Sequence, residues 1–252
     1  MTQSNPRLAA ATAVMAEAGA LARQLFGRRE QFALEEKTAN EFVSEADRQV
    51  ERLIRDRLAV LLPGDAVMGE EMGGAGAPAF WSIDPIDGTA NFLRGSPLWG
   101  VSLGFVVDGN SRVGAICYPA LGLTLAAASG LGMSRQGQPF RREVHFPAVR
   151  VAAVGESPHW SIEGIAAVEM TLRRAGWGIA EYRCASIGLG FAALGYTDGY
   201  IERNLSIWDL AAGAVICAEA GLVTRYGGSN EPAGMWICAA TPEVQTLMAP
   251  HF

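Results

Sequence analysis

The segment from Trp81 to Phe92 constrains this chain more than any other, and it reads WSIDPIDGTANF. The short apolar run from Phe80 to Ile83 overlaps its start and has the character of a buried strand. Asp84 should therefore stand where that strand ends, with Asp87 three residues further on. The proline between them fixes its own φ, and the following glycine lets the backbone approach closely, so both carboxylates can converge on one cation. Hard oxygen ligands of this kind suit Mg²⁺.

The same string can also provide a phosphate site. If a helix begins near Thr89, the backbone amides of Gly88 and Thr89 point at one spot, and a helix N-terminus favours an anion. For Asp-Pro or Asp-Gly alone, the alternative is an ordinary loop with a helix cap. The complete string favours a site at which metal and phosphate meet.

Three further acidic segments are candidates for the same site, and each has a structural alternative. Glu70 and Glu71 follow a glycine, and such a pair alone is usually a solvated surface feature. Ser206 and Asp209 precede an apolar helical run, and S-x-x-D is a variant of the capping box. The segment that ends at Asp47 has the same form. Spacing alone leaves both aspartates as helix-start residues or as ligands.

Composition limits the class of protein. The chain has 252 residues, half of them hydrophobic, which suits one large domain or two small ones. Its formal net charge of -6 argues against a nucleic-acid surface or a polybasic membrane anchor. The four cysteines are scattered, which predicts reduced core thiols. The N-terminal segment fits an amphipathic helix better than a signal peptide, so we expect a cytoplasmic protein.

Hydrophobic periodicity predicts the order of helices and strands. Helices are expected at 7–26, from 44 to about 61, at 161–175 and at 206–220, with strands at 80–83, 99–107, 112–118, 123–128 and 149–154. A polar, glycine-rich stretch at 129–147 separates an α+β half, about 1–140, from an α/β half, about 141–252. The fold class is therefore α/β, with layered α+β character.

Taken together, these motifs resemble the inositol monophosphatase superfamily, in the family's order. They are Glu70-Glu71, the DPIDGT string with Asp84 and Asp87, and the Trp-Asp pair that ends at Asp209. Upstream, Lys37 and the segment ending at Asp47 resemble the family's lysine and its leucine-valine-threonine segment, so the likeness runs from about Lys37 to Gly213. The resemblance implies one phosphatase domain over 1–252, with alternating layers of helices and sheets and a metal site between two subdomains. It also implies two or three Mg²⁺ ions, lithium sensitivity and a homodimer.

The resemblance further implies a role for each matching residue. The first metal would be held by Glu70, Asp84 and the carbonyl of Ile86. The second would be held by Asp84, Asp87 and Asp209, with Glu70 sharing a weaker third ion. The catalytic residues would be Glu70, Thr89 and Asp47, the last two orienting the attacking water. The substrate contacts would be Asp87, Gly88, Thr89 and Glu202.

The implied reaction is the hydrolysis of a small phosphate monoester, myo-inositol monophosphate first, by metal-activated water. Histidinol-phosphate, fructose-1,6-bisphosphate and 3'-phosphoadenosine 5'-phosphate phosphatases share the metal motif, so the motif does not choose among these substrates. Glu202 resembles the family's contact to a substrate hydroxyl, and its alternative is a solvated acid at a strand end. A non-catalytic interaction protein that keeps the fold would be expected to lose ligands, and none is missing. The three histidines form no recognisable constellation.

Overall fold

The computed structural model describes residues 5–32, 35–38, 41–43, 45–74, 77–229 and 234–252. The first helix, α1 (Pro6–Phe26), begins at Asn5, whose side chain accepts from the amides of Arg7 and Leu8, and it ends at Gly27. This confirms the predicted helix. The second, α2 (Glu45–Leu61), carries Asp47 in its first turn as predicted. The expected start of this helix at Ser44 lies outside the described residues.

A seven-stranded sheet forms most of the first half, with its strands in chain order. The strands are β3 (Ala66–Gly69), β4 (Ala79–Asp87), β5 (Gly100–Val107), β6 (Asn110–Tyr118), β7 (Leu123–Ala128), β8 (Met133–Arg135) and β9 (Gln138–Phe140). The predicted hairpin is confirmed: Asp108 and Gly109, both with positive φ, connect β5 to β6 in the geometry that two-residue hairpin loops favour. The polar stretch at 129–147 contains β8 and β9, which the sequence pattern did not predict.

Strand β4 is longer than predicted and corrects the expected end at Asp84. Asp84 pairs with Ser102 and Asp87 pairs with Gly100, so three steps along β4 match two along β5. This bulge accommodates the extra residue, which lets the strand continue past Pro85. Gly88, with φ 84°, then ends the strand, and α3 (Thr89–Arg94) begins at Thr89 as expected. The bulge places the two aspartates in the same strand.

The second half forms a five-stranded sheet in the order β11-β10-β12-β14-β13. Its strands are β10 (Val151–Val154), β11 (Gly178–Ala180), β12 (Gly199–Leu205), β13 (Val223–Gly227) and β14 (Met235–Ala240). Its helices are α4 (Ile162–Arg174), α5 (Ala185–Leu194), α6 (Ile207–Glu219) and α7 (Pro242–Met248). A short pair, β1 (Glu35–Thr38) and β2 (Glu41–Val43), precedes α2. The predictions for β10, α4 and α6 are confirmed to within two residues.

Sequence patterning missed α5, and the structure shows why. Nine of the ten residues of α5 are buried. A helix that is apolar all round lacks the one-sided periodicity by which a surface helix is recognised. The prediction also omitted β12, β13, β14 and α7.

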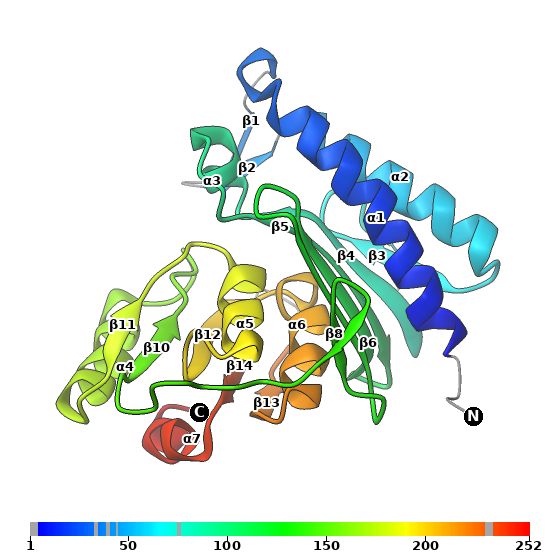
Figure 1. Ribbon diagram of the computed structural model, residues 1–252. Coiled ribbons are helices and arrows are strands. Elements are labelled where there is room, and N and C mark those ends of the chain that lie inside the picture. The colour runs from blue at the N-terminus through cyan, green and yellow to red at the C-terminus, as the bar shows by residue number, and fades with distance from the viewer. Residues whose placement is uncertain (1–4, 33–34, 39–40, 44, 75–76, 230–233) are drawn as a thin grey trace.

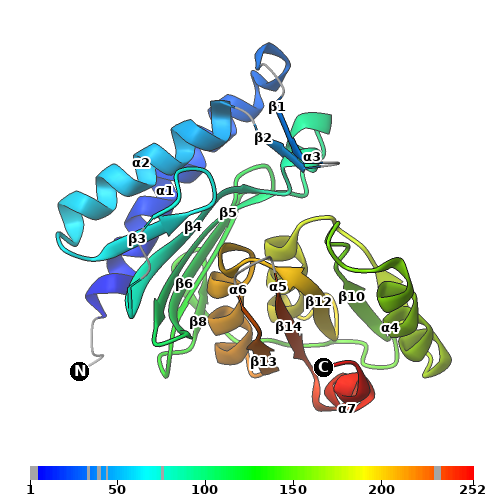
Figure 2. The ribbon, with the colours of Figure 1, turned by 180° about the vertical axis from the view of Figure 1, so that it is seen from behind.

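The elements stack in alternating layers, which confirms the expected fold (Figures 1 and 2). Helices α1 and α2 cover one face of the seven-stranded sheet, and α5 and α6 lie between the two sheets. Helices α4 and α7 cover the outer face of the smaller sheet. Each helical layer has its own hydrophobic core. All four cysteines are free and buried, as predicted.

Glycines allow α6 to lie close against the large sheet. A Cβ at Gly104 in β5 would lie 2.7 Å from the Cβ of Ala211, and one at Gly114 in β6 would lie 2.3 Å from the carbonyl oxygen of Ala212. Real Cβ atoms do not approach this closely, so larger residues there would push the helix outward. The close approach brings the first turn of α6 near the end of β4.

Candidate active site

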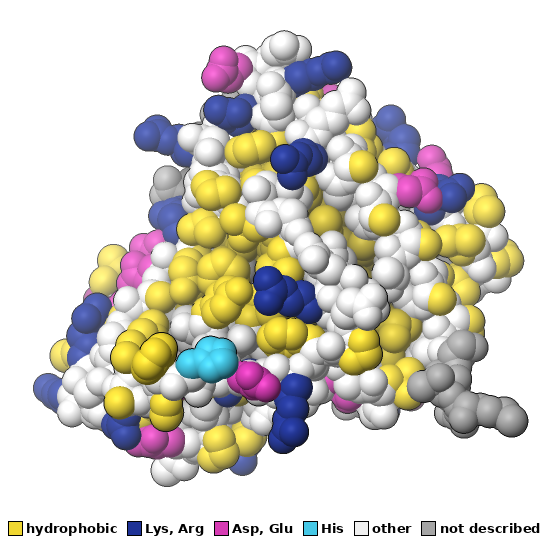
Figure 3. All heavy atoms as spheres, viewed as in Figure 1, with side chains coloured by type: hydrophobic (Ala, Val, Ile, Leu, Met, Phe, Trp, Pro, Cys, Tyr) yellow, Lys and Arg dark blue, Asp and Glu magenta, His cyan; other side chains and the backbone are white. Residues whose placement is uncertain are grey.

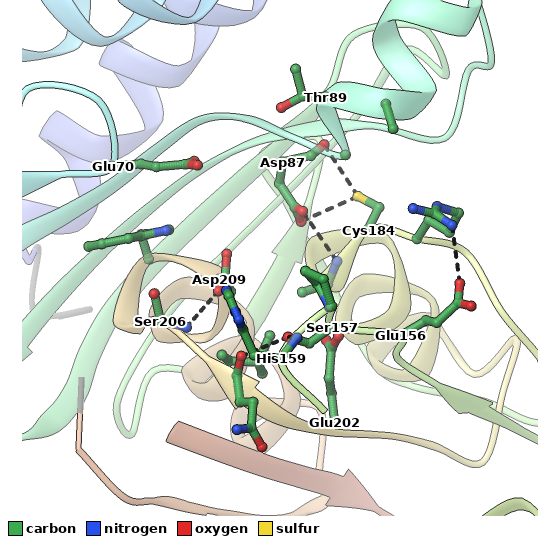
Figure 4. Close-up of a pocket in the computed structure, with 18 residues that line it drawn as sticks. Glu70, Asp87, Thr89, Glu156, Ser157, His159, Cys184, Glu202, Ser206 and Asp209 are labelled. Carbon is green, nitrogen blue, oxygen red and sulfur yellow. Dashed lines mark hydrogen bonds and ion pairs between the residues drawn. The ribbon is translucent and has the colours of Figure 1, made fainter. Parts of the chain in front are cut away.

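A cavity of about 440 Å³ lies between the two sheets. The end of β4 and the start of α3 form one side of the cavity, and the first turns of α5 and α6 and the strand β12 form the other. Its carboxylates include Glu70, Asp87, Glu202 and Asp209, which come from four separate segments (Figure 4). The fold therefore gathers acids that are far apart in the sequence.

Asp84 is a buried acid that lies close to the carboxylates of this cavity without lining it. Its side chain is buried, and burial raises its pKa well above the ordinary value. The negative charges of Glu70, Asp87, Asp209 and Asp47 raise the pKa further, in that order. Four other carboxylates are thus close enough to act on Asp84 through space, so a cation among them would relieve strong repulsion.

Asp87 is held by the first turn of α5. The backbone amides of Ala185 and Ser186 donate to its carboxylate, and the thiol of Cys184 donates to Oδ2 at 3.3 Å (Figure 4). Burial raises the pKa of Asp87, and these hydrogen bonds partly offset the increase. Helix dipole and amides together favour a carboxylate here. Sequence reasoning missed these partners because it did not identify α5.

Asp209 completes a helix cap and also lies among the acids of the cavity. The amide of Ser206 donates to Oδ2 of Asp209 at 2.7 Å, which completes the capping box at the start of α6. The capping interpretation is therefore correct, but the same side chain also lines the cavity. Burial raises the pKa of Asp209 well above its ordinary value, and Asp87 and Glu70 add to the increase. A cap alone would not require burial beside other acids.

Residues around the bulge of β4 contribute backbone and hydroxyl groups. Thr89 donates its hydroxyl to the carbonyl of Ile86 at 3.0 Å, and both Gly88 and Thr89 line the cavity. Asp47, 1% exposed, is close enough to raise the pKa of Asp84. The structure thus brings the acidic and backbone groups that the sequence motifs indicated close together, around the cavity at the end of β4.

Glu202 is not the solvated strand-end acid of the alternative interpretation. It lies within β12 and is only 5% exposed. The hydroxyl of Tyr200 and the backbone amide of Ser157 donate to its carboxylate. Burial is the main cause that raises the pKa of Glu202 to about 8, and the charge of Asp87 contributes. Glu202 nonetheless lines the cavity.

Several lining residues carried no sequence signal. Glu156, Ser157 and His159 belong to the loop after β10, and Arg183 precedes α5. Arg183 pairs with Glu156 at 3.3 Å and has φ 52°, an uncommon conformation for a residue other than glycine. Only the fold brings this loop to the cavity, since β10 and β12 are adjacent in the sheet.

The donor set fits a hard divalent cation. Oδ1 of Asp84 is buried, and no hydrogen-bonding partner for it exists among the described residues. An ionised carboxylate oxygen of this kind needs a cation or a proton. Within the same part of the chain, no three acidic, imidazole or thiol groups are drawn close enough to enclose a metal by themselves.

Comparison with known proteins agrees with this geometry. The pattern of the inositol monophosphatase family matches residues 3–252. An inositol-1-monophosphatase from Mycobacterium leprae is 36% identical over 228 residues, which cover 84% of this chain and 78% of the relative. A fructose-1,6-bisphosphatase/inositol-1-monophosphatase from Aquifex aeolicus is 32% identical over 222 residues, covering 86% and 83%.

A solved structure shows the same fold. The extragenic suppressor protein suhB from Bartonella henselae superposes with a TM-score of 0.85 at 26% identity, covering 98% of each chain. With the family match over nearly the whole sequence, this agreement extends beyond the motifs to every layer. The chain therefore belongs to the inositol monophosphatase family and is a phosphoric monoester hydrolase.

Proposed function

We propose that this protein hydrolyses myo-inositol monophosphate with the help of two or three Mg²⁺ ions. The observation that carries the proposal is the buried Asp84 oxygen without a partner, surrounded by Glu70, Asp87 and Asp209. Metal dependence is general in this family, which supports a cation at this place. Carboxylate oxygens are the ligands that Mg²⁺ prefers.

The residues have distinct parts in the proposed mechanism. Glu70, Asp84 and the Ile86 carbonyl would hold one ion, and Asp84, Asp87 and Asp209 a second, with Glu70 shared by a weaker third. Magnesium there would supply Lewis acidity toward the phosphate and lower the pKa of water. The protein's own groups determine geometry, because Asp84 and Asp87 lie on strand β4, Asp209 lies at the start of α6, and Glu70 lies in the turn after β3.

Thr89 and Asp47 are proposed to orient the attacking water. The Thr89 hydroxyl donates a hydrogen bond to the carbonyl oxygen of Ile86, so the lone pairs of the hydroxyl oxygen remain available to accept a hydrogen bond from water. The carboxylate of Asp47 would hold the second hydrogen of that water. The amides of Gly88 and Thr89 would bind phosphate oxygens.

The choice of inositol monophosphate is supported by the relatives, several of which are named inositol-1-monophosphatase. Others carry a double name that includes fructose-1,6-bisphosphatase. Fructose-1,6-bisphosphate is therefore the second candidate, ahead of histidinol phosphate and 3'-phosphoadenosine 5'-phosphate.

Phosphate release from these four compounds, with and without Mg²⁺, tests the proposal. We expect turnover of inositol monophosphate that requires Mg²⁺, disappears in excess chelator and falls in millimolar Li⁺. Unchanged hydrolysis in chelator would contradict the metal mechanism. A higher kcat/KM for another of the four compounds would reassign the substrate and leave the mechanism intact.

Glu202 should tune substrate choice, because it lines the cavity from β12, on the side opposite Thr89 (Figure 4). If Glu202 accepts a hydrogen bond from a substrate hydroxyl, Glu202→Ala should lower kcat/KM for inositol monophosphate. The expected factor corresponds to roughly 1 to 3 kcal/mol of lost interaction free energy. An aryl phosphate lacks that hydroxyl and should lose little. Steady-state kinetics on both substrates at saturating Mg²⁺ makes the comparison.

Tyr200→Phe is the matched control for Glu202. It removes the internal hydroxyl that donates to Glu202 and leaves the carboxylate in place, so substrate preference should persist. Equal losses on both substrates in Glu202→Ala would indicate damage to the metal site rather than a lost substrate contact.

We also propose a homodimer that pairs through an aromatic face, defined by Tyr182, Phe191 and Tyr196. The ring of Phe191 contacts the rings of Tyr182 and Tyr196 edge to face, with centroids 5.3 Å apart in each of the two pairs. Tyr196 is 56% exposed. Hydrophobic side chains gather in the middle of the face in Figure 3, where α5 lies in Figure 1. Exposed aromatic groups of this kind are common in interfaces. The mass in solution, with Tyr196→Glu as the disrupting variant, tests the pairing.

Among the described residues, no helix is long and apolar enough to cross a membrane. We propose a cytoplasmic location, which the four buried free thiols support because disulfides are rare in that reducing compartment. Cell fractionation tests it.

A further inference from the structure

The turn that carries Glu70 is closed on itself. The amide of Gly69 donates to the carbonyl of Gly73 at 2.9 Å, and the amide of Gly73 returns a bond to Gly69 at 3.1 Å. Glu70 is also tied to the neighbouring strand, since its amide donates to the carbonyl of Ile83 at 3.1 Å. The backbone at Glu70 is thus fixed beside the residue that precedes Asp84.

A second carboxylate anchors this turn from behind. Glu51 of α2 is completely buried, and it is not one of the residues that line the cavity. Its Oε2 accepts the amide of Glu71 at 2.9 Å, and its Oε1 accepts the amide of Met72 at 3.2 Å. The two backbone amides that follow Glu70 in the chain therefore both donate hydrogen bonds to the Glu51 side chain.

Arg55, one turn further along α2, completes the anchor. Its Nε donates to Oε1 of Glu51 at 2.7 Å, and its guanidinium also donates to the carbonyl of Gly73. The Glu51 carboxylate is therefore charge-paired, and each of its oxygens accepts a hydrogen bond, which is the condition under which a buried charge is tolerated. Glu51 thus binds amides within the closed turn, and Arg55 binds the carbonyl at its end.

The sequence leaves space for this arrangement. A Cβ at Gly69 would lie 2.1 Å from Oε1 of Glu51, so only glycine permits the carboxylate to reach the turn. A buried ion pair is seldom better for stability than well-packed apolar residues of similar size. The burial of Glu51 at this position is therefore better explained by the turn that it orients than by a contribution to the free energy of unfolding.

We propose that Glu51 is a positioning residue for the metal site, and that it acts through the turn to hold Glu70 toward Asp84 and Asp209. This inference rests on the proposed function, in which Glu70 is a metal ligand. Partners that orient metal ligands change metal affinity by about 10- to 100-fold when they are replaced. Glu51 touches neither substrate nor metal in this arrangement.

The test compares wild type with Glu51→Gln. The amide side chain keeps one acceptor but turns a donor toward the second backbone amide, so the turn should loosen while the fold remains. We expect the Mg²⁺ concentration for half-maximal thermal stabilisation, and that for half-maximal activity, to rise at least tenfold, with kcat largely recovered at saturating Mg²⁺. Amide hydrogen exchange at Glu71 and Met72 in the metal-free protein should become faster.

Two further variants keep the test decisive. Arg55→Gln removes the charge partner at a half-buried position and should produce a smaller shift in the same direction, which matters if Glu51→Gln does not fold. Arg57 lies on the same helix as Glu51, and Arg57→Gln breaks its exposed ion pair with Glu17 of α1, so this variant should leave the Mg²⁺ midpoint unchanged.

A lower melting temperature in Glu51→Gln with an unchanged Mg²⁺ midpoint would overturn the inference, since Glu51 would then be only structural. An unchanged exchange rate at both amides would also overturn it. If the wild type shows neither stabilisation nor activity with Mg²⁺, the proposed function itself fails, and the amide exchange rates still decide whether Glu51 holds the turn.

Discussion

Asp84→Asn should reduce kcat by on the order of 10³-fold, even at saturating Mg²⁺, because it removes the negative charge of the carboxylate that would contribute to both the first and the second ion. A metal contributes several kcal/mol to charge stabilisation in the transition state, and about 4 kcal/mol corresponds to that factor. Phosphate release under single-turnover conditions measures the loss without interference from product release.

The same variant should stabilise the metal-free protein at neutral pH. Burial and four neighbouring acids raise the pKa of Asp84 in the folded state, whereas the unfolded chain keeps the ordinary value. Asp84 therefore contributes stability that is fully present below the unfolded pKa and is lost as pH rises through the folded pKa. Asparagine cannot ionise, so the variant should not show this loss.

Chemical denaturation in chelator at a series of pH values measures the difference. The wild-type free energy of unfolding should fall relative to that of Asp84→Asn as pH rises. Asp108→Asn is the control, because Asp108 lies exposed in the β5–β6 turn with φ 48°, where asparagine fits equally well. A variant less stable than wild type throughout would show that Asp84 is favourably paired without metal.

Asp209→Asn should lower kcat/KM for inositol monophosphate by about 10²- to 10³-fold and weaken Mg²⁺ binding, while α6 keeps its start. Asp209 is the third residue of α6, and the asparagine oxygen at that position can still accept the amide of the N-cap residue Ser206, so the capping box is kept. What the variant loses is one negative charge at the proposed second ion. Activity against Mg²⁺ concentration, with thermal unfolding alongside, measures both effects.

Asp209→Ala separates the cap from the charge. It removes both, so it should add about 1 kcal/mol of destabilisation to the same catalytic defect. Normal turnover and an unchanged Mg²⁺ requirement in Asp209→Asn would show that Asp209 is a cap alone. Ser206→Ala, which affects only the other half of the capping box, should leave the Mg²⁺ requirement unaltered.

The sequence by itself determined the local elements and the identity of the acids. The helix α1, the β5–β6 hairpin and the start of α3 follow from periodicity, from a two-residue turn and from Gly88, all of which act over a few residues. The DPIDGT string indicated a site where metal and phosphate meet, because ligand type and spacing are local properties, whereas the phosphatase activity and the roles of the other acidic segments came from the resemblance to the inositol monophosphatase superfamily.

The tertiary structure decided how those residues are held. The bulge that keeps Asp84 and Asp87 in one strand depends on pairing with β5, which no pattern within β4 specifies. The first turn of α5, about a hundred residues later, anchors Asp87, and burial on all sides removes the periodicity that would have identified this helix.

Burial also decided the state of the acids. Glu202 has the same side chain whether it is solvated or enclosed, and only the stacking of β12 within the second sheet encloses it and raises its pKa to about 8. Glu51 carries no motif at all, and its role follows from a turn twenty residues away that folds onto it. Sequence specifies which groups are present, whereas desolvation and long-range contacts, which arise only on folding, specify what those groups can do.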